Sequence, residues 1–221
     1  MNLQMPLFSA RNVCFKGIVQ YPDIDIEEGR ATFISGESGC GKSSLLRLIS
    51  GVTSPDAGEI TYRGKPVADY DPVGLRREVL LCSQASYLFD TDVDENFAKY
   101  YGYRDLPAPT PEQIRPYLGV CAFDMPGNTP CHTMSGGERQ RVFTAICLSL
   151  RPKVLMMDEP TSALDDTTAN KMLSNIKIFC AEHGITLIVV SHNAALVQAY
   201  ADDIITLGVC LQTITAGRAQ A

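Results

Sequence analysis

The chain has 221 residues, of which 45% are hydrophobic and 20% are charged, and its formal net charge is −6. This length suits one domain, or one core with a sub-lobe, and the balance of residues excludes a disordered chain. A strong nucleic-acid binder would need a basic face, so the acidic net charge argues against nucleic acid as a partner.

The first third of the chain predicts short strands around a glycine-rich loop. A small buried strand at residues 31–35 leads into the loop, and the residues after it are apolar at helical spacing, which predicts a helix over residues 42–50. Gly51 suits the end of this helix. Further strands and strand-like apolar runs are expected at residues 12–15, 24–26, 59–62 and 78–82.

The stretch from residue 85 to residue 133 differs from its surroundings, because it contains six prolines and shows weaker strand patterning. We interpret it as a mainly helical sub-lobe with irregular connections, and we expect a further helix at residues 136–150. The whole chain, residues 1–221, is then one domain. Its core comprises about residues 1–84 and 148–221, and its helical sub-lobe about residues 85–147.

The last third of the chain alternates strands with helices. Residues 154–158 form a continuous apolar run that ends in acid, and residues 185–190 form a second strand-like run. Helices are expected at residues 168–182 and 194–200. This alternation predicts an α/β fold with a mainly parallel sheet, and the apolar strands indicate a sheet that is covered on both faces.

Neither a signal peptide nor a membrane-spanning segment is indicated. The N-terminal residues lack a basic region followed by a long apolar run, and no apolar stretch reaches the roughly 18 residues of a membrane helix. The eight cysteines form no C-x-x-C pair, so we expect reduced thiols in a cytoplasmic protein. They are Cys14, Cys40, Cys82, Cys121, Cys131, Cys147, Cys180 and Cys210.

The glycine-rich loop matches the phosphate-binding pattern G-x-x-x-x-G-K-[ST]. Glycines allow backbone N–H groups to point at phosphate oxygens, and the following helix presents its positive end to the same anion. Lys42 would place its charge near the β- and γ-phosphates of a nucleotide, and Ser43 would offer its hydroxyl to Mg²⁺. Cys40 is read as a small filler rather than as a thiolate favoured by the helix start. The loop residues are Gly36, Glu37, Ser38, Gly39, Cys40, Gly41, Lys42 and Ser43.

Two carboxylates follow the apolar run at residues 154–157. Ligands bind open α/β sheets at the carboxyl ends of their strands, where Asp158 and Glu159 would lie. Asp158 would hold Mg²⁺ directly or through water, and Glu159 would polarise the water that attacks the γ-phosphate. An acid after a strand also often caps the next helix, but the phosphate loop upstream favours the catalytic interpretation.

The segment at residues 134–141, MSGGERQR, narrows the class of protein. It resembles the signature motif of ATP-binding-cassette (ABC) ATPases, and it stands just before the acidic strand, as in that family. Gln84 resembles the Q-loop glutamine of the family, residues 160–165 resemble the D-loop, and His192 resembles the switch histidine. The resemblance covers residues 36–192 in the order of the family and implies the P-loop ABC ATPase fold, with a small N-terminal antiparallel β part.

The resemblance implies a site that is shared between two copies. The signature of one subunit closes over the ATP on the phosphate loop of the other, which requires a two-fold dimer of this chain with itself or with a homologous cassette. The signature residues would act in trans, although they also match a plain helix start with a capping box. Met134 stands where Leu is commoner, and Glu138 where Gln is commoner. The signature residues are Ser135, Gly136, Gly137 and Glu138.

The resemblance also assigns roles to residues outside the loops already named. His192 would contact the γ-phosphate and act with Glu159, and Gln84 would reach Mg²⁺ or the attacking water. Ser44 completes the ATP-binding set, at a position where Thr is usual. In the family an aromatic residue about 20 positions before the phosphate loop usually stacks on adenine. Phe15 is our choice for that residue, and Tyr21 is the alternative.

These features together predict a subunit that binds ATP and Mg²⁺, hydrolyses ATP and drives a membrane transporter. It would be cytoplasmic and peripheral on the inner face of the cell membrane. Its cargo, and whether it imports or exports, would be set by the membrane subunit. A soluble ABC ATPase of DNA repair or translation is the alternative, but such proteins usually carry coiled-coil arms or tandem cassettes. An unrelated phosphate-loop kinase would have no reason to carry the signature.

The region from Gln84 to Phe97 would contact a cytoplasmic helix of a polytopic membrane subunit. Its large side chains are Tyr87, Leu88, Phe89 and Phe97. The same side chains would instead be buried if they formed the core of the sub-lobe, and the sequence alone leaves both interpretations open.

Overall fold

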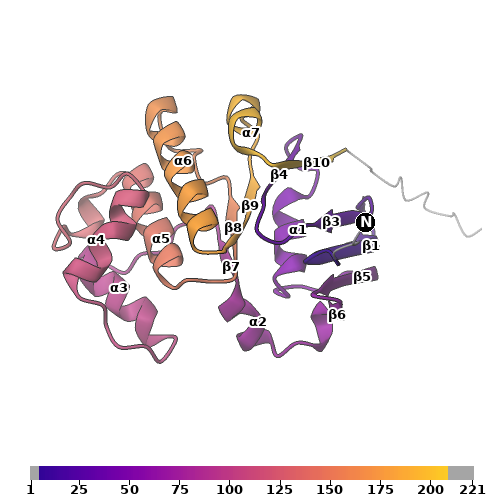
Figure 1. Cartoon of the computed structure of the whole chain (residues 1–221), viewed down its shortest axis with the longest axis horizontal. Coiled ribbons are helices and arrows are strands. Elements are labelled where there is room, and N and C mark those ends of the chain that lie inside the picture. The colour runs from indigo at the N-terminus through magenta and orange to yellow at the C-terminus, as the bar shows by residue number, and fades with distance from the viewer. Residues whose placement is uncertain (1–4, 209–221) are drawn as a thin grey trace, which may run out of the picture.

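A five-stranded parallel sheet forms the centre of the chain, which the computed structural model describes over residues 5–208 (Figure 1). Every neighbouring pair of its strands is parallel. Two of its three inner strands, at residues 154–158 and 186–190, are almost wholly apolar and buried, as expected for a sheet covered on both faces. In spatial order the strands are β10 (Asp203–Leu207), β4 (Ala31–Gly36), β9 (Thr186–Val190), β8 (Val154–Asp158) and β7 (Val79–Cys82).

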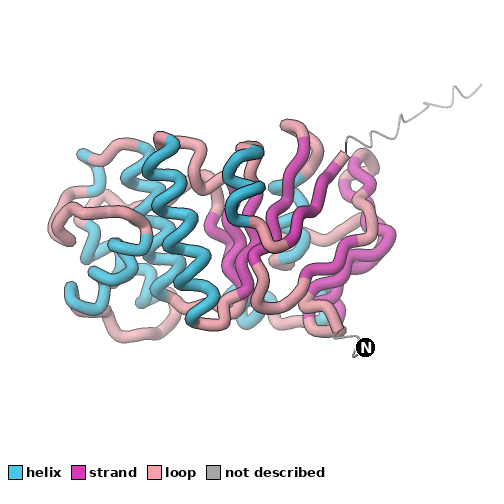
Figure 2. The backbone as a smooth tube through the Cα atoms, turned by 45° about the horizontal axis from the view of Figure 1, so that its top comes forward, coloured by secondary structure: helices cyan, strands magenta, loops and turns pink. Residues whose placement is uncertain are grey.

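A second, antiparallel sheet comes from the N-terminal part of the chain. Its long strand β1 pairs with β2, β3 and β5, and β5 pairs in turn with β6. The two groups of strands are distinct in the tube view (Figure 2). The strands are β1 (Phe8–Phe15), β2 (Val19–Gln20), β3 (Ile24–Ile26), β5 (Ala57–Tyr62) and β6 (Lys65–Pro66).

The helices of the core flank the parallel sheet. α1 packs against β4, β5 and β8, whereas α6 packs against β9 and α7. Asp71 begins α2 as its N-cap, since its carboxylate accepts from the Gly74 N–H at 2.6 Å and Pro72 occupies the first turn. These helices are α1 (Lys42–Ile49), the short helix η1 (Val67–Asp69), α2 (Pro72–Glu78), α6 (Asp166–Glu182) and α7 (Ala194–Tyr200).

Three further helices gather on the side of the central sheet away from the antiparallel strands (Figure 1). α3 and α4 pack against α5, and α5 also packs against β7 of the central sheet. The residues from 85 to 147 are therefore mainly helical, while the limits of the sub-lobe stay a prediction. The elements are α3 (Val93–Gly102), α4 (Pro111–Val120), η2 (Cys131–Thr133) and α5 (Gly136–Ser149).

Two hydrophobic clusters meet on the central sheet. Along β8, Leu155 and Met157 belong to the cluster that includes α3, α4 and α5, whereas Val154 and Met156 belong to the cluster under the antiparallel sheet. The alternation follows from the two-residue period of a strand. The helices at residues 93–149 therefore share their core with one face of the sheet.

The expected α/β fold is confirmed, together with the parallel sheet, the antiparallel part and the helices. The elements missed from the sequence include α2, whose Asp-Pro start was not used, and β10, which is short and half exposed. The short elements β2, β6 and η1 were also missed. Among residues 5–208, no helix is both long and apolar enough to cross a membrane. Seven cysteines are free thiols in this range, and Cys210 lies outside the described residues.

Candidate functional site

The phosphate loop connects β4 to α1 and depends on glycine at both of its ends. Gly36 has a φ of 149°, and a Cβ there would lie 2.4 Å from the Leu207 carbonyl oxygen. Gly41 has a φ of 97°, and its Cβ would lie 2.8 Å from the Tyr21 hydroxyl. A side chain at either position would clash with a neighbouring strand or side chain, so the sequence folds locally in this way only with glycine.

The loop and the start of α1 form a site that suits phosphate. Gly41 is the N-cap of α1 and provides no capping side chain, so the first N–H groups of the helix are free to bind an anion. The Lys42 ammonium is buried and donates to the carbonyl oxygens of Gly36 and Glu37, each at 2.8 Å. Cys40 is buried in the same loop, with its Sγ 4.0 Å from the Lys42 Nζ.

Ser43 and Asp158 meet although 115 positions separate them in the sequence. The Ser43 hydroxyl donates to Asp158 Oδ1 at 3.0 Å, because the ends of β4 and β8 lie at the same edge of the sheet. Burial raises the pKa of Asp158 above its ordinary value, while the hydrogen bond from Ser43 opposes this shift. A hydroxyl and a half-buried carboxylate side by side are oxygen ligands of the kind that Mg²⁺ takes, so these residues fit the ion.

Glu159 and His192 face each other next to the Ser43–Asp158 pair. The Glu159 Oε1 lies 3.4 Å from the His192 Nδ1, and both residues line a cavity of about 170 Å³. Asp158 ends β8 and Glu159 follows it directly, while residues 191–193 follow β9, the neighbouring strand. A wider hollow of about 670 Å³ next to it is lined by Gly36, Glu37 and Ser38 of the phosphate loop as well as by His192. The carboxylate, the imidazole and the phosphate loop are therefore grouped at one edge of the sheet.

Gln84 and the two candidates for the adenine-stacking residue, Phe15 and Tyr21, differ in how far they are exposed to solvent. Gln84 is exposed, two residues after β7, and no hydrogen bond of its side chain is found within residues 5–208. Phe15 ends β1 partly exposed, with the Lys16 ammonium 5.5 Å from its ring. Tyr21 is only 3% exposed, so its ring is not free to stack on a base. This burial removes the alternative and leaves Phe15 as the predicted stacking residue.

The signature begins α5 with a capping box. The Glu138 N–H donates to the Ser135 hydroxyl oxygen at 3.3 Å, and the Ser135 N–H donates to Glu138 Oε2 at 2.7 Å. The Ser135 hydroxyl also donates to Glu138 Oε2 at 2.7 Å, and the two bonds that this carboxylate accepts, from the Ser135 hydroxyl and the Ser135 N–H, lower the pKa of Glu138. Within the described residues no hydrogen bond joins Ser135, Gly136, Gly137 or Glu138 to the phosphate loop of the same chain.

The structure adds two polar residues whose contacts the sequence did not reveal. The Tyr21 hydroxyl donates to the Gly41 carbonyl oxygen at 2.9 Å, beneath the phosphate loop. The Gln140 amide on α5 donates to the Glu159 carbonyl oxygen at 3.1 Å. Each contact joins elements that are far apart in the chain, so no local pattern could have identified it.

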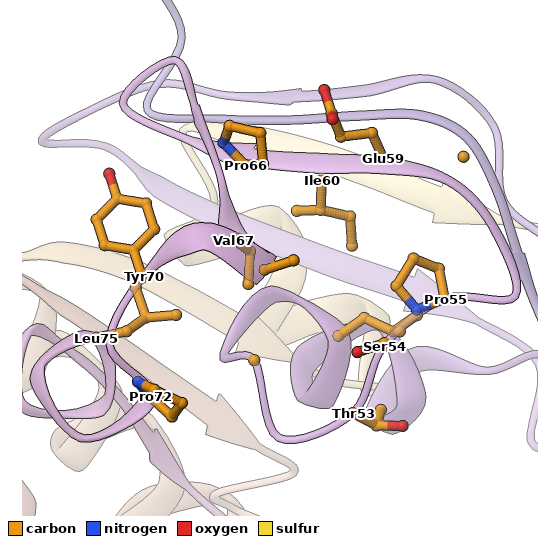
Figure 3. Close-up of a pocket in the computed structure, with 14 residues that line it drawn as sticks. Thr53, Ser54, Pro55, Glu59, Ile60, Pro66, Val67, Tyr70, Pro72 and Leu75 are labelled. Atoms are coloured by element: carbon orange, nitrogen blue, oxygen red, sulfur yellow. The ribbon is translucent and has the colours of Figure 1, made fainter.

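A separate cavity of about 300 Å³ lies between α1, β5 and α2, and it is mostly apolar (Figure 3). Its lining includes Ile60, Val67 and Leu75 but none of the predicted site residues. The arrangement that suits a nucleotide is therefore at the sheet edge and not in this cavity. A phosphate loop, a hydroxyl–carboxylate pair of the kind that fits Mg²⁺ and a carboxylate beside a histidine are typical of a nucleotide-hydrolysing enzyme of the phosphate-loop class.

Comparisons with known proteins agree with this class. A family model described as "ABC transporter" matches residues 19–162. The chain is 30% identical over 214 residues to "Probable iron export ATP-binding protein FetA" of Escherichia coli (strain K12), covering 94% of this chain and 93% of that protein. It is 35% identical over 201 residues to "Spermidine/putrescine import ATP-binding protein PotA" of Spiroplasma citri, covering 88% of this chain and 55% of that protein.

Solved structures of ABC transporter cassettes are also similar to this chain. The dimeric structure of MJ0796, a bacterial ABC transporter cassette, has a TM-score of 0.80 and 25% identity, and covers 93% of this chain and 97% of its own. The same cassette in a dimeric post-hydrolysis state with ADP and Pi has a TM-score of 0.77 and 26% identity, with 91% and 96% covered. The chain therefore belongs to the ABC transporter family. It is an ATP-binding subunit of this family and an ATPase.

Proposed function

We propose that this subunit hydrolyses ATP with the residues grouped at the sheet edge and thereby drives a transporter. The N–H groups at the start of α1 and the Lys42 ammonium would bind the β- and γ-phosphates. Ser43 and Asp158 would hold Mg²⁺, with Gln84 as a further ligand. Mg²⁺, when bound, neutralises the charge that develops on the phosphates. The observation that carries this proposal is the Ser43–Asp158 hydrogen bond, which joins the phosphate loop to the acidic strand.

Glu159 and His192 would carry the chemistry in this proposal. Glu159 accepts a proton from, or polarises, the water that attacks the γ-phosphate, and its carboxylate borders the cavity where that water would lie. His192 contacts the γ-phosphate from the neighbouring strand end. Phe15, the aromatic candidate that is partly exposed, stacks on adenine.

The active unit is proposed to be a dimer in which each ATP lies between two subunits. Ser135 and Gly136 are exposed at the start of α5, and within residues 5–208 neither they nor the buried Gly137 form a hydrogen bond to the chain's own phosphate loop. The signature of one copy would therefore close over the ATP of the other. The dimeric solved relatives support this arrangement, and the partner would be a second copy or a homologous cassette.

The membrane subunit is proposed to dock at the region from Gln84 to Phe97, on the inner face of the cell membrane. Tyr87 is 62% exposed there, and its ring lies edge-on to Phe89 with centroids 5.1 Å apart. Tyr100 of α3 and Tyr103, which follows α3, extend the aromatic group beyond that region. Leu88 and Phe97 of the same region are buried and belong to the core. The docking surface is therefore proposed to comprise Tyr87, Phe89, Tyr100 and Tyr103.

The cargo is proposed to be selected by that membrane subunit. The relatives are named for opposite directions and different cargoes: iron export, spermidine and putrescine import, methionine import and Fe(3+) import. The chain spans 93% of the first of them but only 51% to 65% of the others. A shared ATPase with different cargoes indicates that specificity lies outside the conserved cassette.

Two experiments test this function. Glu159→Gln should bind Mg-ATP without turning it over and should then run as a dimer on gel filtration, and a strictly monomeric variant at saturating Mg-ATP would exclude the shared site. Tagged wild-type protein, extracted from its own cells in mild detergent, should co-purify with a polytopic membrane protein. Recovery of ribosomes or DNA-repair proteins instead would favour the soluble ABC ATPase and leave the ATP chemistry unchanged.

A further inference from the structure

The backbone of Glu159 adopts a conformation that must be held by its surroundings. Its φ is 50°, in the left-handed region that residues with a side chain rarely occupy. Its N–H donates to the Val190 carbonyl oxygen at 3.1 Å. Its carbonyl oxygen accepts two side-chain hydrogen bonds, from Gln140 Nε2 at 3.1 Å and from Ser162 Oγ at 3.1 Å. The same carbonyl oxygen also accepts from the Ser162 N–H at 3.3 Å, and these four bonds hold the backbone from which the Glu159 side chain projects.

Gln140 comes from a different part of the molecule than the other two partners. Val190 ends the neighbouring strand and Ser162 lies three residues after Glu159, whereas Gln140 lies on α5, within the signature segment 134–141 and two residues after Glu138. Its side chain is buried, with 4% of the residue exposed, so its amide needs a hydrogen-bond partner inside the protein. The partner that it has is the Glu159 carbonyl.

The first turn of α5 also packs directly on the segment that follows Glu159. A Cβ on Gly137 would lie 2.7 Å from the Ala163 carbonyl oxygen and 2.8 Å from Leu164 Cδ2. Glycine at this position lets α5 approach the backbone of residues 159–164 more closely than any side chain would allow. Gly137 and Gln140 therefore tie the start of α5 to the segment that carries Glu159.

We infer that Gln140 is a positioning residue that sets the direction of the Glu159 carboxylate toward His192. The inference rests on the proposed function, because it takes Glu159 as the residue that acts on water. Since α5 begins with the signature, the helix that would contact the partner's ATP also holds the Glu159 of its own chain. A displacement of α5 would therefore turn the Glu159 carboxylate without touching the phosphate loop.

Gln140→Met tests this inference, because methionine has a similar length and no donor. The Glu159 carbonyl keeps its hydrogen bond from Ser162, so the variant leaves no unpaired acceptor and should fold. We expect kcat to fall about tenfold, with KM for ATP within about twofold of wild type, because misplacement of a catalytic group affects the chemical step. Thr144→Val is the matched control, since Thr144 is buried on the same helix and donates to the Gln140 carbonyl at 2.8 Å. It should keep kcat within about twofold.

Measuring Gln140→Met in Glu159→Gln protein distinguishes a loss of Glu159 positioning from a general disturbance of the fold. In Glu159→Gln protein the carboxylate is already absent, so Gln140→Met should lower the residual single-turnover rate by less than about twofold. An equal loss in both backgrounds, or an unchanged kcat in wild-type background, overturns the inference. Gln140→Leu replaces Gln140→Met if the latter does not fold. Failure to find a membrane partner would count against the transporter function alone, because these rates are measured on the purified chain.

Discussion

The phenol of Tyr21 offers a direct test of how the phosphate loop is held. Its hydroxyl donates to the Gly41 carbonyl oxygen at 2.9 Å, and Gly41 is the left-handed residue that begins α1. Burial raises the pKa of Tyr21 to about 12, so the hydroxyl keeps its proton and remains a donor at neutral pH. Tyr21→Phe removes this donor and keeps the ring. We therefore expect a looser phosphate loop inside an otherwise unchanged fold.

The loss of stability expected for Tyr21→Phe is that of one hydrogen bond. The Gly41 carbonyl also accepts from the Leu45 N–H at 2.9 Å, so it is not left unpaired, and the loss should be about 0.5–1.5 kcal/mol. For a chain of this size that corresponds to a fall of roughly 1–6 °C in the melting temperature. In the variant, ATP binding itself would have to order the phosphate loop, which the Tyr21 hydrogen bond orders in the wild-type protein. The free energy lost with this hydrogen bond should therefore weaken ATP binding by about two- to tenfold.

Tyr70→Phe provides the matched control. The Tyr70 hydroxyl donates to the Tyr62 carbonyl oxygen at 2.8 Å, which is the same type of bond, and it lies beside the apolar cavity instead of the phosphate loop. Differential scanning fluorimetry and ATP titration by calorimetry should show similar losses of stability but weaker ATP binding only for Tyr21→Phe. Equal ATP affinity in the two variants would refute the argument that the Tyr21 hydroxyl organises the loop.

Two pH-dependent predictions follow from the carboxylates of the site. The pKa of Asp158 is raised above its ordinary 3.8, so ionised Asp158 costs stability at neutral pH. Asp158→Asn should therefore melt no lower than wild type at pH 7.5 in the absence of nucleotide, lose Mg²⁺-dependent ATPase activity, and approach wild-type stability as the pH falls through the raised pKa. The pKa of Glu138 is instead lowered below its ordinary 4.5, so its contribution is present above that value and is lost as the pH falls through the lowered pKa. Chemical denaturation of Glu138→Ala should show a deficit of about 0.5–2 kcal/mol at neutral pH that disappears in acid, whereas Glu138→Gln should keep most of the cap at every pH.

The sequence predicted the parts of the site that depend on local patterns. The phosphate loop and the acid at the end of β8 each require particular residues at fixed spacing after a strand, and parallel strands deliver such residues to one edge. The contacts of Tyr21 and Gln140 depend instead on how the antiparallel sheet and α5 pack on the core. Such contacts are set by tertiary packing, which leaves no periodic signal in a single sequence.

The aromatic residues after Gln84 also could not be sorted from the sequence, because tertiary packing buries some of them and leaves others exposed within one short segment. Phe97 is fully buried on α3, so Phe97→Ala should cost about 3–5 kcal/mol of stability. Tyr87 is 62% exposed, and its neighbour Tyr100 bonds to its backbone carbonyl at 2.7 Å and not to its side chain. Tyr87→Ala should therefore change stability by no more than about 0.5 kcal/mol in urea unfolding.

The same variant should lose the membrane subunit if Tyr87 belongs to the docking surface. Ile178→Ala on α6 is the control, because Ile178 is 54% exposed and lies outside the aromatic group. Co-purification from detergent extracts should fall for Tyr87→Ala and stay at wild-type level for Ile178→Ala. An exposed aromatic side chain at the centre of an interface normally contributes strongly to binding. If a stably folded Tyr87→Ala protein still co-purified with the membrane subunit, the docking surface would therefore have to lie outside this segment.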